Sequence, residues 1–140
     1  MKKLLLAVIV SLSTVTTAAL AEIKVGIILG FTGPIESLTP AMRDGARMAF
    51  DEASNSGNLL GGETITILEA DSTCVDSAAA TAAAEGVISQ VVAAIMGADC
   101  SGVTGAIASN VAVPNGVVMI SPSATSVSYT HLPLPTNREV

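Results

Sequence analysis

Four short apolar segments alternate with longer helical segments along the chain, and few folds accommodate such an order. The segments typical of strands, rich in valine and isoleucine, are 23–29, 64–70, 91–96 and 117–120. The segments with helical spacing of apolar residues are 39–53, 77–89 and 101–112. Strand–helix–strand units of this length give parallel strands with right-handed connections. We therefore predict an open, parallel α/β sheet with helices on both faces.

Composition supports a sheet that is buried on both sides. The strand segments are continuously apolar rather than alternating, which is typical of such a sheet. Half of the 140 residues are apolar and 13% are charged, compared with about a quarter in an average soluble domain. This apolar content excludes disorder. The alanine block 78–84 predicts a helix that lies close to the sheet. Together with the alternation of strands and helices, this predicts a Rossmann-like α/β fold.

Particular residues mark the expected helix starts. Thr39 is expected to cap the first helix, with Pro40 at its first position. Asp76 is expected to cap the second helix, and Ser101 is suited to cap the third.

Charge and motif content exclude several classes of function. The net charge of −6 leaves no basic surface for nucleic acid. One histidine and two cysteines show no metal-ligand spacing. Residues 97–102 have the glycine spacing of a phosphate-binding loop, but the lysine that should follow is missing. Since a G-x-S-x-G nucleophile motif is also missing, we expect no enzyme activity, no cofactor and no metal.

Residues 1–21 are typical of a secretory signal peptide. Lys2 and Lys3 give a positive start, residues 4–10 an apolar core, and residues 19–21 an Ala-Leu-Ala cleavage site. We predict export and cleavage after Ala21; an N-terminal membrane anchor is the alternative. The apolar run is shorter than the roughly 20 residues that span a bilayer, and nothing after Ala21 suggests a membrane span.

Cys74 and Cys100 follow the second and third predicted strands. In an exported chain this favours a disulfide between them, with free thiols as the alternative. Closing a loop of about 26 residues would contribute roughly 3–4 kcal/mol on the chain-entropy model. The bond would also fix the loop that carries Ser101.

Residues 127–140 depart from the strand–helix pattern. They hold the only tyrosine, the only histidine and two of the six prolines, and Pro133 excludes the helix expected next. Residues 127–132 (Val-Ser-Tyr-Thr-His-Leu) resemble translated sequencing-adapter read-through. We expect 127–140 to be a non-native tail, with a genuine irregular terminus as the alternative, and 22–126 to be part of one lobe.

Ligands of open α/β sheets bind beyond the carboxyl ends of the strands, near the point where strand order reverses. Three loops are expected there, at 30–38, 99–102 and 121–125; all contain small hydroxyl residues, and the first two also contain glycine. At Ser101 a hydroxyl and the first helical amides would favour an anionic group such as a carboxylate. Alternatively, Ser101 only caps its helix.

Over residues 22–126, the order and spacing of several short motifs resemble the type I periplasmic binding proteins of the branched-chain amino acid kind. Besides the leader, the motifs are 23–25 (Ile-Lys-Val), 32–34 (Thr-Gly-Pro), 44–49 (Asp-Gly-Ala-Arg-Met-Ala), 51–53 (Asp-Glu-Ala), 71–74 (Asp-Ser-Thr-Cys), 100–101 (Cys-Ser) and 120–125 (Ile-Ser-Pro-Ser-Ala-Thr). The resemblance implies a periplasmic receptor with two lobes. It would deliver an amino acid or a related small polar solute to an inner-membrane ABC permease complex.

The resemblance also implies roles for single residues in this partial N-terminal ligand-binding lobe. The Ser101 hydroxyl and N–H would hold the α-carboxylate of the ligand. The Ser123 carbonyl would accept a hydrogen bond from the ligand's ammonium group, and Thr125 would contact both groups. Ala124 belongs to the same ligand-binding segment.

The Cys74 and Cys100 pair matches the disulfide of the resembled family. Leu38 is also a predicted ligand contact, but branched-chain receptors carry a tyrosine there, so leucine, isoleucine or valine specificity is not implied. The alternative function is an extracellular ligand-sensing domain of a receptor or regulator, which would continue into a membrane span or a signalling domain. A secreted α/β enzyme would need a nucleophile or metal cluster further along the chain.

Overall fold

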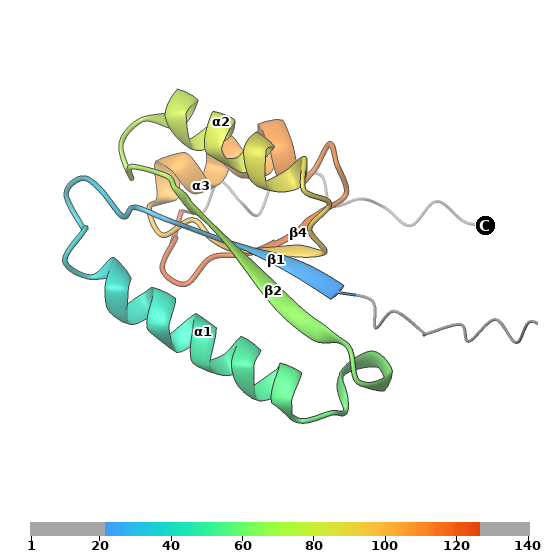
Figure 1. Ribbon diagram of the computed structural model, residues 1–140. Coiled ribbons are helices and arrows are strands. Elements are labelled where there is room, and N and C mark those ends of the chain that lie inside the picture. The colour runs from blue at the N-terminus through green and yellow to red at the C-terminus, as the bar shows by residue number, and fades with distance from the viewer. Residues whose placement is uncertain (1–21, 127–140) are drawn as a thin grey trace, which may run out of the picture.

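The computed structural model describes residues 22–126 and places strands and helices in alternation (Figure 1). The predicted signal peptide and the predicted tail lie outside the described residues. The strands are β1 (Glu22–Leu29), β2 (Thr64–Asp71), β3 (Ala94–Gly97) and β4 (Val118–Ile120). The helices are α1 (Thr39–Asn55), the 3₁₀ turn η1 (Leu59–Gly61), α2 (Ser77–Ile88), α3 (Ser101–Ile107) and its π-helical continuation η2 (Ala108–Ala112).

The four strands form one parallel sheet in the order β2-β1-β3-β4. β1 pairs with β2 along its whole length, from Glu22 opposite Thr64 to Leu29 opposite Asp71. The chain leaves β1 on one side to form β2 and returns to the other side to form β3. The predicted parallel α/β sheet is therefore confirmed, and its strand order reverses between β1 and β3.

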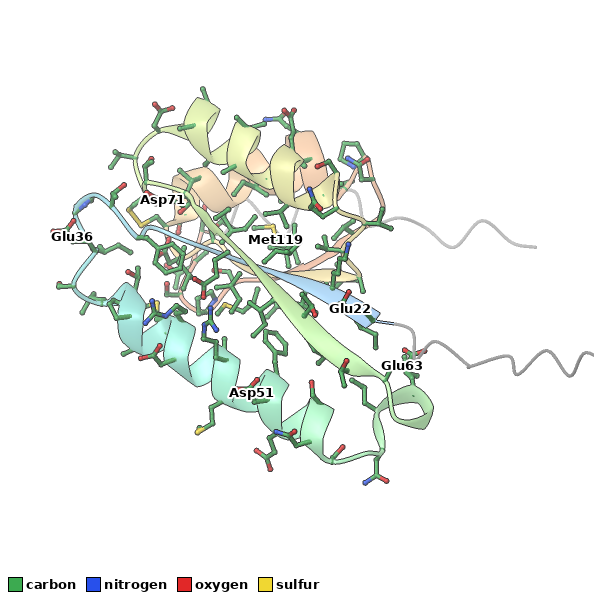
Figure 2. The ribbon with its side chains drawn as sticks, in the orientation of Figure 1. Glu22, Glu36, Asp51, Glu63, Asp71 and Met119 are labelled. Carbon is green, nitrogen blue, oxygen red and sulfur yellow. A yellow bond between two sulfur atoms is a disulfide. The ribbon has the colours of Figure 1, made fainter. Side chains whose placement is uncertain are left out.

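Helices α2 and α3 cover one face of the sheet, and α1 covers the other (Figure 1). Under α2 and α3 lies a core of fully buried branched side chains, each contributing about 1.5–3 kcal/mol relative to exposure. Ala80 and Ala84 of α2 are 0% exposed, so the alanine block lies against this core, as predicted. Met119 of β4 packs against the same core (Figure 2). The central members of the core are Ile28, Ile95, Val103, Ile107 and Val111.

The α1 face is held by both apolar and polar contacts. Arg47 of α1 forms an ion pair with Glu69 of β2 at 2.7 Å. The hydroxyl of Ser54 accepts a hydrogen bond from the Ile65 N–H at 2.9 Å. Because side chains alternate along a strand, the β1 residues under α1 are the odd-numbered ones. These buried residues are Val25, Ile27 and Leu29.

β4 forms an edge of the described sheet. Its side chains Val118 and Ile120 lie on the face opposite to Met119 and are 62% and 67% exposed. Among residues 22–126, no helix is both long enough and apolar enough to cross a membrane.

The third strand starts later than predicted. It begins at Ala94, whereas the sequence prediction began at Val91. Val91 has a left-handed φ of 60°, is 85% exposed, and donates its N–H to the Ile88 carbonyl. The first residues of the predicted strand therefore form the turn that leaves α2.

The prediction for the second helix cap is confirmed, and that for the first is wrong. The Asp76 side chain accepts hydrogen bonds from the first amides of α2. The cap position of α1 is Leu38, without a capping bond from its side chain. Thr39 is fully buried, and its hydroxyl donates to the Glu36 carbonyl at 3.1 Å.

Gly97 ends β3 at a point where a larger residue does not fit. Its φ is +132°, a region that L side chains rarely adopt. A Cβ atom there would lie 1.9 Å from the Ile28 carbonyl oxygen of the neighbouring strand. The glycine therefore lets the chain leave β3 close to β1.

Candidate functional site

The carboxyl ends of the strands lie at one end of the molecule. Figure 2 shows Glu36 and Asp71 at this end and Glu22 and Glu63 at the opposite end. We call the loops that meet there the loop cluster. It comprises residues 30–38 after β1, 72–75 after β2, 98–100 after β3 with the start of α3, and 121–126 after β4.

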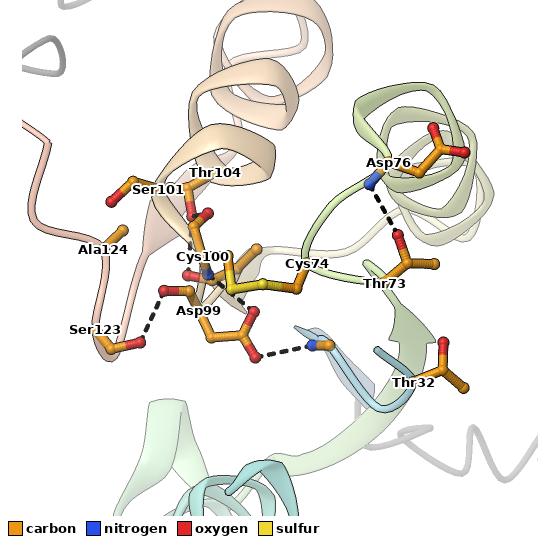
Figure 3. The surroundings of a disulfide bond; sticks show 12 residues. Thr32, Thr73, Cys74, Asp76, Asp99, Cys100, Ser101, Thr104, Ser123 and Ala124 are labelled. Atoms are coloured by element: carbon orange, nitrogen blue, oxygen red, sulfur yellow. Dashed lines mark hydrogen bonds between the residues drawn. A yellow bond between two sulfur atoms is a disulfide. The ribbon is translucent and has the colours of Figure 1, made fainter. Parts of the chain in front are cut away.

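Asp99 lies at the centre of the loop cluster (Figure 3). It is 3% exposed, and its carboxylate accepts hydrogen bonds from the N–H groups of Gly30 at 2.8 Å and Cys100 at 2.9 Å. The Ser123 hydroxyl donates to the Asp99 main-chain carbonyl at 2.8 Å. Asp99, in the loop after β3, thus also contacts the loops after β1 and β4.

Ser101 is the first residue of α3, so the prediction that it caps the helix is wrong. The cap position is Cys100, whose side chain makes no capping bond. The Ser101 hydroxyl instead accepts a hydrogen bond from the Thr125 N–H at 3.2 Å. Figure 3 shows Ser123 and Ala124 facing the start of α3. Four of the predicted ligand contacts therefore come together.

Further hydroxyl groups hold the loops after β3 and β4 in place. The Thr104 hydroxyl lies 3.0 Å from the Ala98 carbonyl and 2.9 Å from the Cys100 carbonyl, to which it donates. The Ser121 hydroxyl also donates to the Ala98 carbonyl and accepts from the Ala124 N–H at 2.9 Å. Sequence reasoning assigned no role to Asp99, Thr104 or Ser121, because their partners are set by tertiary contacts.

Leu38 reaches this end of the sheet from a different direction. It precedes α1, which covers the face opposite to α3, and its side chain is 56% exposed. The structure places it in the loop after β1, where its N–H donates to the Ile35 carbonyl at 2.9 Å.

The predicted disulfide joins two loops of the cluster. Cys74, in the loop after β2, is bonded to Cys100, with 5.2 Å between their Cα atoms. The bond spans 26 positions of sequence and holds the residue before Ser101 (Figure 3). The disulfide interpretation is confirmed over the alternative of free thiols.

Asp71 ties the loop after β1 to the loop after β2. Burial raises the pKa of its carboxyl group, but hydrogen bonds from the Thr32 hydroxyl and from the amides of Thr73, Thr32 and Phe31 outweigh burial. The net effect lowers the pKa of Asp71 below its ordinary value. The carboxylate is thus stabilised in its charged form by the loops that it connects.

The loop cluster offers groups that bind small polar molecules by hydrogen bonding. Its hydroxyls, amides and carbonyls are the polar groups that typically orient a ligand in a cleft. Arg43 and Arg47 lie on α1 and pair with Asp44 and Glu69. Within the described part of the chain, no group of three or more histidine, cysteine, aspartate or glutamate side chains is placed to hold a metal ion.

Known proteins with similar sequences are binding proteins for leucine or for leucine, isoleucine and valine. The Leu/Ile/Val-binding protein BraC3 of Rhizobium johnstonii is 30% identical over 128 residues, which cover 91% of this chain and 34% of that protein. The leucine-specific-binding protein of Salmonella typhimurium has the same identity and coverage. The chain therefore spans about a third of the length of the curated relatives that it matches.

The solved structures with similar folds also include binding proteins for leucine and isoleucine. The substrate-binding protein LivJ of a branched-chain amino acid transporter from Streptococcus pneumoniae, crystallised with isoleucine, has a TM-score of 0.70 and 32% identity, covering 79% of this chain and 31% of LivJ. The leucine binding protein LivK from Thermotoga maritima has a TM-score of 0.67 and 28% identity, with 78% and 30% coverage. The family model described as periplasmic binding protein matches residues 22–137. With that match spanning most of its length, the chain belongs to the periplasmic binding protein family.

Proposed function

We propose that this chain is part of the periplasmic substrate-binding component of an ABC transporter, which binds an amino acid or a related small polar solute for uptake. Members of the family bind amino acids, work with ABC permeases and are not enzymes. The observation that carries the proposal is the contact between the Ser101 hydroxyl and the Thr125 N–H at the carboxyl edge of the sheet. This is the edge at which ligands of open α/β sheets bind.

Four residues at the start of α3 and after β4 have proposed roles. The Ser101 hydroxyl and N–H hold the α-carboxylate of the ligand, and the Ser123 carbonyl accepts from its ammonium group. Thr125 contacts both groups, and Ala124 lines the same segment. The Ser123 hydroxyl already donates to Asp99, which supports an internal role for that side chain and leaves recognition to the backbone.

The charge of the loop cluster favours a zwitterionic ligand over a dianion. The cluster carries the carboxylates of Glu36 and Asp99 and borders that of Asp71 at the end of β2, whereas the arginines of the described residues lie on α1. A second carboxylate on the ligand would meet repulsion without a compensating cation from the described loops. Leu38 stands in place of the tyrosine of the branched-chain receptors, so we do not propose leucine, isoleucine or valine in particular.

The whole protein is proposed to be exported and to have two lobes. The signal peptide is proposed to be removed after Ala21, because members of the family work in the periplasm. The described sheet supplies one side of the binding cleft. The other side is proposed to come from the remainder of a chain as long as its relatives.

The test is calorimetric titration of the full-length gene product, with the coding sequence read from the source DNA through and past the codon for Ser126. The panel comprises the twenty common amino acids and uncharged polar solutes. We expect saturable binding of at least one zwitterionic amino acid. No binding to any member of the panel would overturn the proposed function.

Substitution of Ser101 locates the site. Ser101→Ala removes a hydroxyl that hydrogen-bonds a charged group, and we expect the dissociation constant to rise about tenfold or more. Ser109→Ala on η2 is the matched control, because Ser109 is exposed and lies beyond the loop cluster. Equal affinity of Ser101→Ala and wild type would remove Ser101 from the site.

A further inference from the structure

Three strand-end loops are joined through one buried acidic residue. The Asp99 carboxylate accepts from Gly30, 69 positions away in sequence, and from Cys100. Its carbonyl accepts from the Ser123 hydroxyl, 24 positions away. These three bonds connect the ends of β1, β3 and β4 and span the point where strand order reverses.

A carboxylate in this position is costly unless its oxygens are satisfied. Burying a charged group is unfavourable without a partner, and Asp99 is 3% exposed. The arginine ion pairs of the described chain involve Asp44 and Glu69 instead. Two backbone amides therefore stabilise the Asp99 carboxylate through charge-assisted bonds, which are stronger than neutral ones.

The disulfide fixes a different pair of loops. Cys74 and Cys100 join the loops after β2 and β3, whereas Asp99 reaches the loops after β1 and β4. Gly30 lies between the disulfide and the Asp99 carboxylate. A Cβ added to it would be 3.2 Å from the Cys74 Cβ and 3.5 Å from the Asp99 carboxylate. The Gly30 end of the β1 loop is therefore hydrogen-bonded to the Asp99 carboxylate, whereas Asp71 holds the same loop at Thr32 and the disulfide makes no bond to it.

We propose that Asp99 is a positioning residue of the ligand site. It sets the distance between the β1 loop and the segment 123–125, and it holds Cys100 and therefore Ser101 in the orientation that receives the ligand. This inference rests on the proposed function, since it concerns the same site. Asp99 itself is buried beneath the loops and acts through the backbone groups that it binds.

The test compares Asp99→Asn with wild type in the full-length protein. The asparagine has the same shape, but its NH₂ group cannot accept a hydrogen bond, so one of the two amides loses its acceptor. We expect the dissociation constant for the bound amino acid to rise about tenfold. We also expect the ¹H–¹⁵N resonances of Gly30, Cys100 and Thr125 to move in the absence of ligand.

Two control variants separate positioning from stability. Asp76→Asn changes a carboxylate that also accepts two backbone amides, but at the start of α2 and exposed. Val111→Ala destabilises the core from a side chain that is 1% exposed. Both controls should keep the wild-type affinity and the wild-type positions of the Gly30 and Thr125 resonances.

The outcomes are distinct. Wild-type affinity and unmoved Gly30 and Thr125 resonances in Asp99→Asn would overturn the proposal, as would an equal affinity loss in Val111→Ala. If Asp99→Asn does not fold, hydrogen exchange of the wild-type protein tests the proposal instead. The Gly30 amide should then exchange as slowly as the core of β1. Exchange at the rate of an exposed loop would overturn the proposal. Failure of wild type to bind any amino acid would instead count against the proposed function, while the resonances still report on Asp99.

Discussion

Removing the Cys74–Cys100 disulfide should destabilise this lobe by an amount that follows from the length of the loop it closes. The two cysteines are separated by 26 positions. On the chain-entropy model, opening a loop of this size increases the freedom of the unfolded chain and costs about 3.5 kcal/mol at 25 °C. The double variant Cys74→Ala and Cys100→Ala should therefore lose about this much free energy of unfolding.

The measurement is made on the full-length protein, with hydrogen exchange followed by mass spectrometry for peptides from 22–126. Exchange of the peptides from β1 and β3 gives the free energy of opening of this lobe, separately from the rest of the protein. The single variant Cys74→Ala is the control. It should lose nearly as much as the double variant, because the bond and not the side chains provides the effect.

The double variant also tests which group holds the Gly30 amide in place. Because Asp99 and not the disulfide accepts the hydrogen bond of the Gly30 amide, this amide should keep its protection relative to β1 in the double variant. A loss of less than about 1 kcal/mol for the lobe would refute the loop-closure argument. Selective exposure of Gly30 in the double variant would refute the division of roles between bond and carboxylate.

Substitutions at Gly97 and Asp71, with Gly102→Ala as a control, test the packing and the electrostatics at the carboxyl ends of the strands. Gly97→Ala should prevent folding of the sheet, because its Cβ would lie 1.9 Å from a backbone oxygen, whereas Gly102→Ala, with nothing within 4 Å, should express in soluble form with wild-type circular dichroism. The lowered pKa of Asp71 means that its stabilising effect is present above the ordinary carboxyl pKa of about 4 and is lost as pH falls through the lower folded value. Between about pH 5 and pH 2, urea denaturation should therefore depend less steeply on pH in Asp71→Asn than in wild type; equal slopes would contradict the assignment.

The arrangement of the elements could be predicted because the apolar sequence of each strand indicates that the strand is buried on both faces. Continuous apolar runs and helices of crossover length leave parallel pairing as the consistent solution. Asp76 was predictable as a cap because its partners follow two and three residues later. Thr39 and Val91 were not, because tertiary contact buries the first and a left-handed turn exposes the second.

The candidate site was predictable at the level of loops but not of contacts. Parallel topology brings the strand ends together, so the loops near Ser101 and Thr125 had to be neighbours. The bond from Gly30 to Asp99 could not be anticipated, since it joins residues 69 positions apart and depends on the order of the strands. An aspartate in a polar loop gives no sequence signal that distinguishes a buried acceptor from a solvated charge.

The free edge at β4 has a practical consequence for anyone who produces this stretch by itself. Within residues 22–126, β4 is an edge strand with two exposed branched side chains, Val118 and Ile120, and such an edge is a template for the same strand of another copy. We expect the isolated stretch to aggregate during expression, and Ile120→Lys should reduce this aggregation. In the full-length protein the same lysine would lower the stability if a later segment packs on this face of β4. The effect of this one substitution therefore tells whether the rest of the chain covers this face of the sheet.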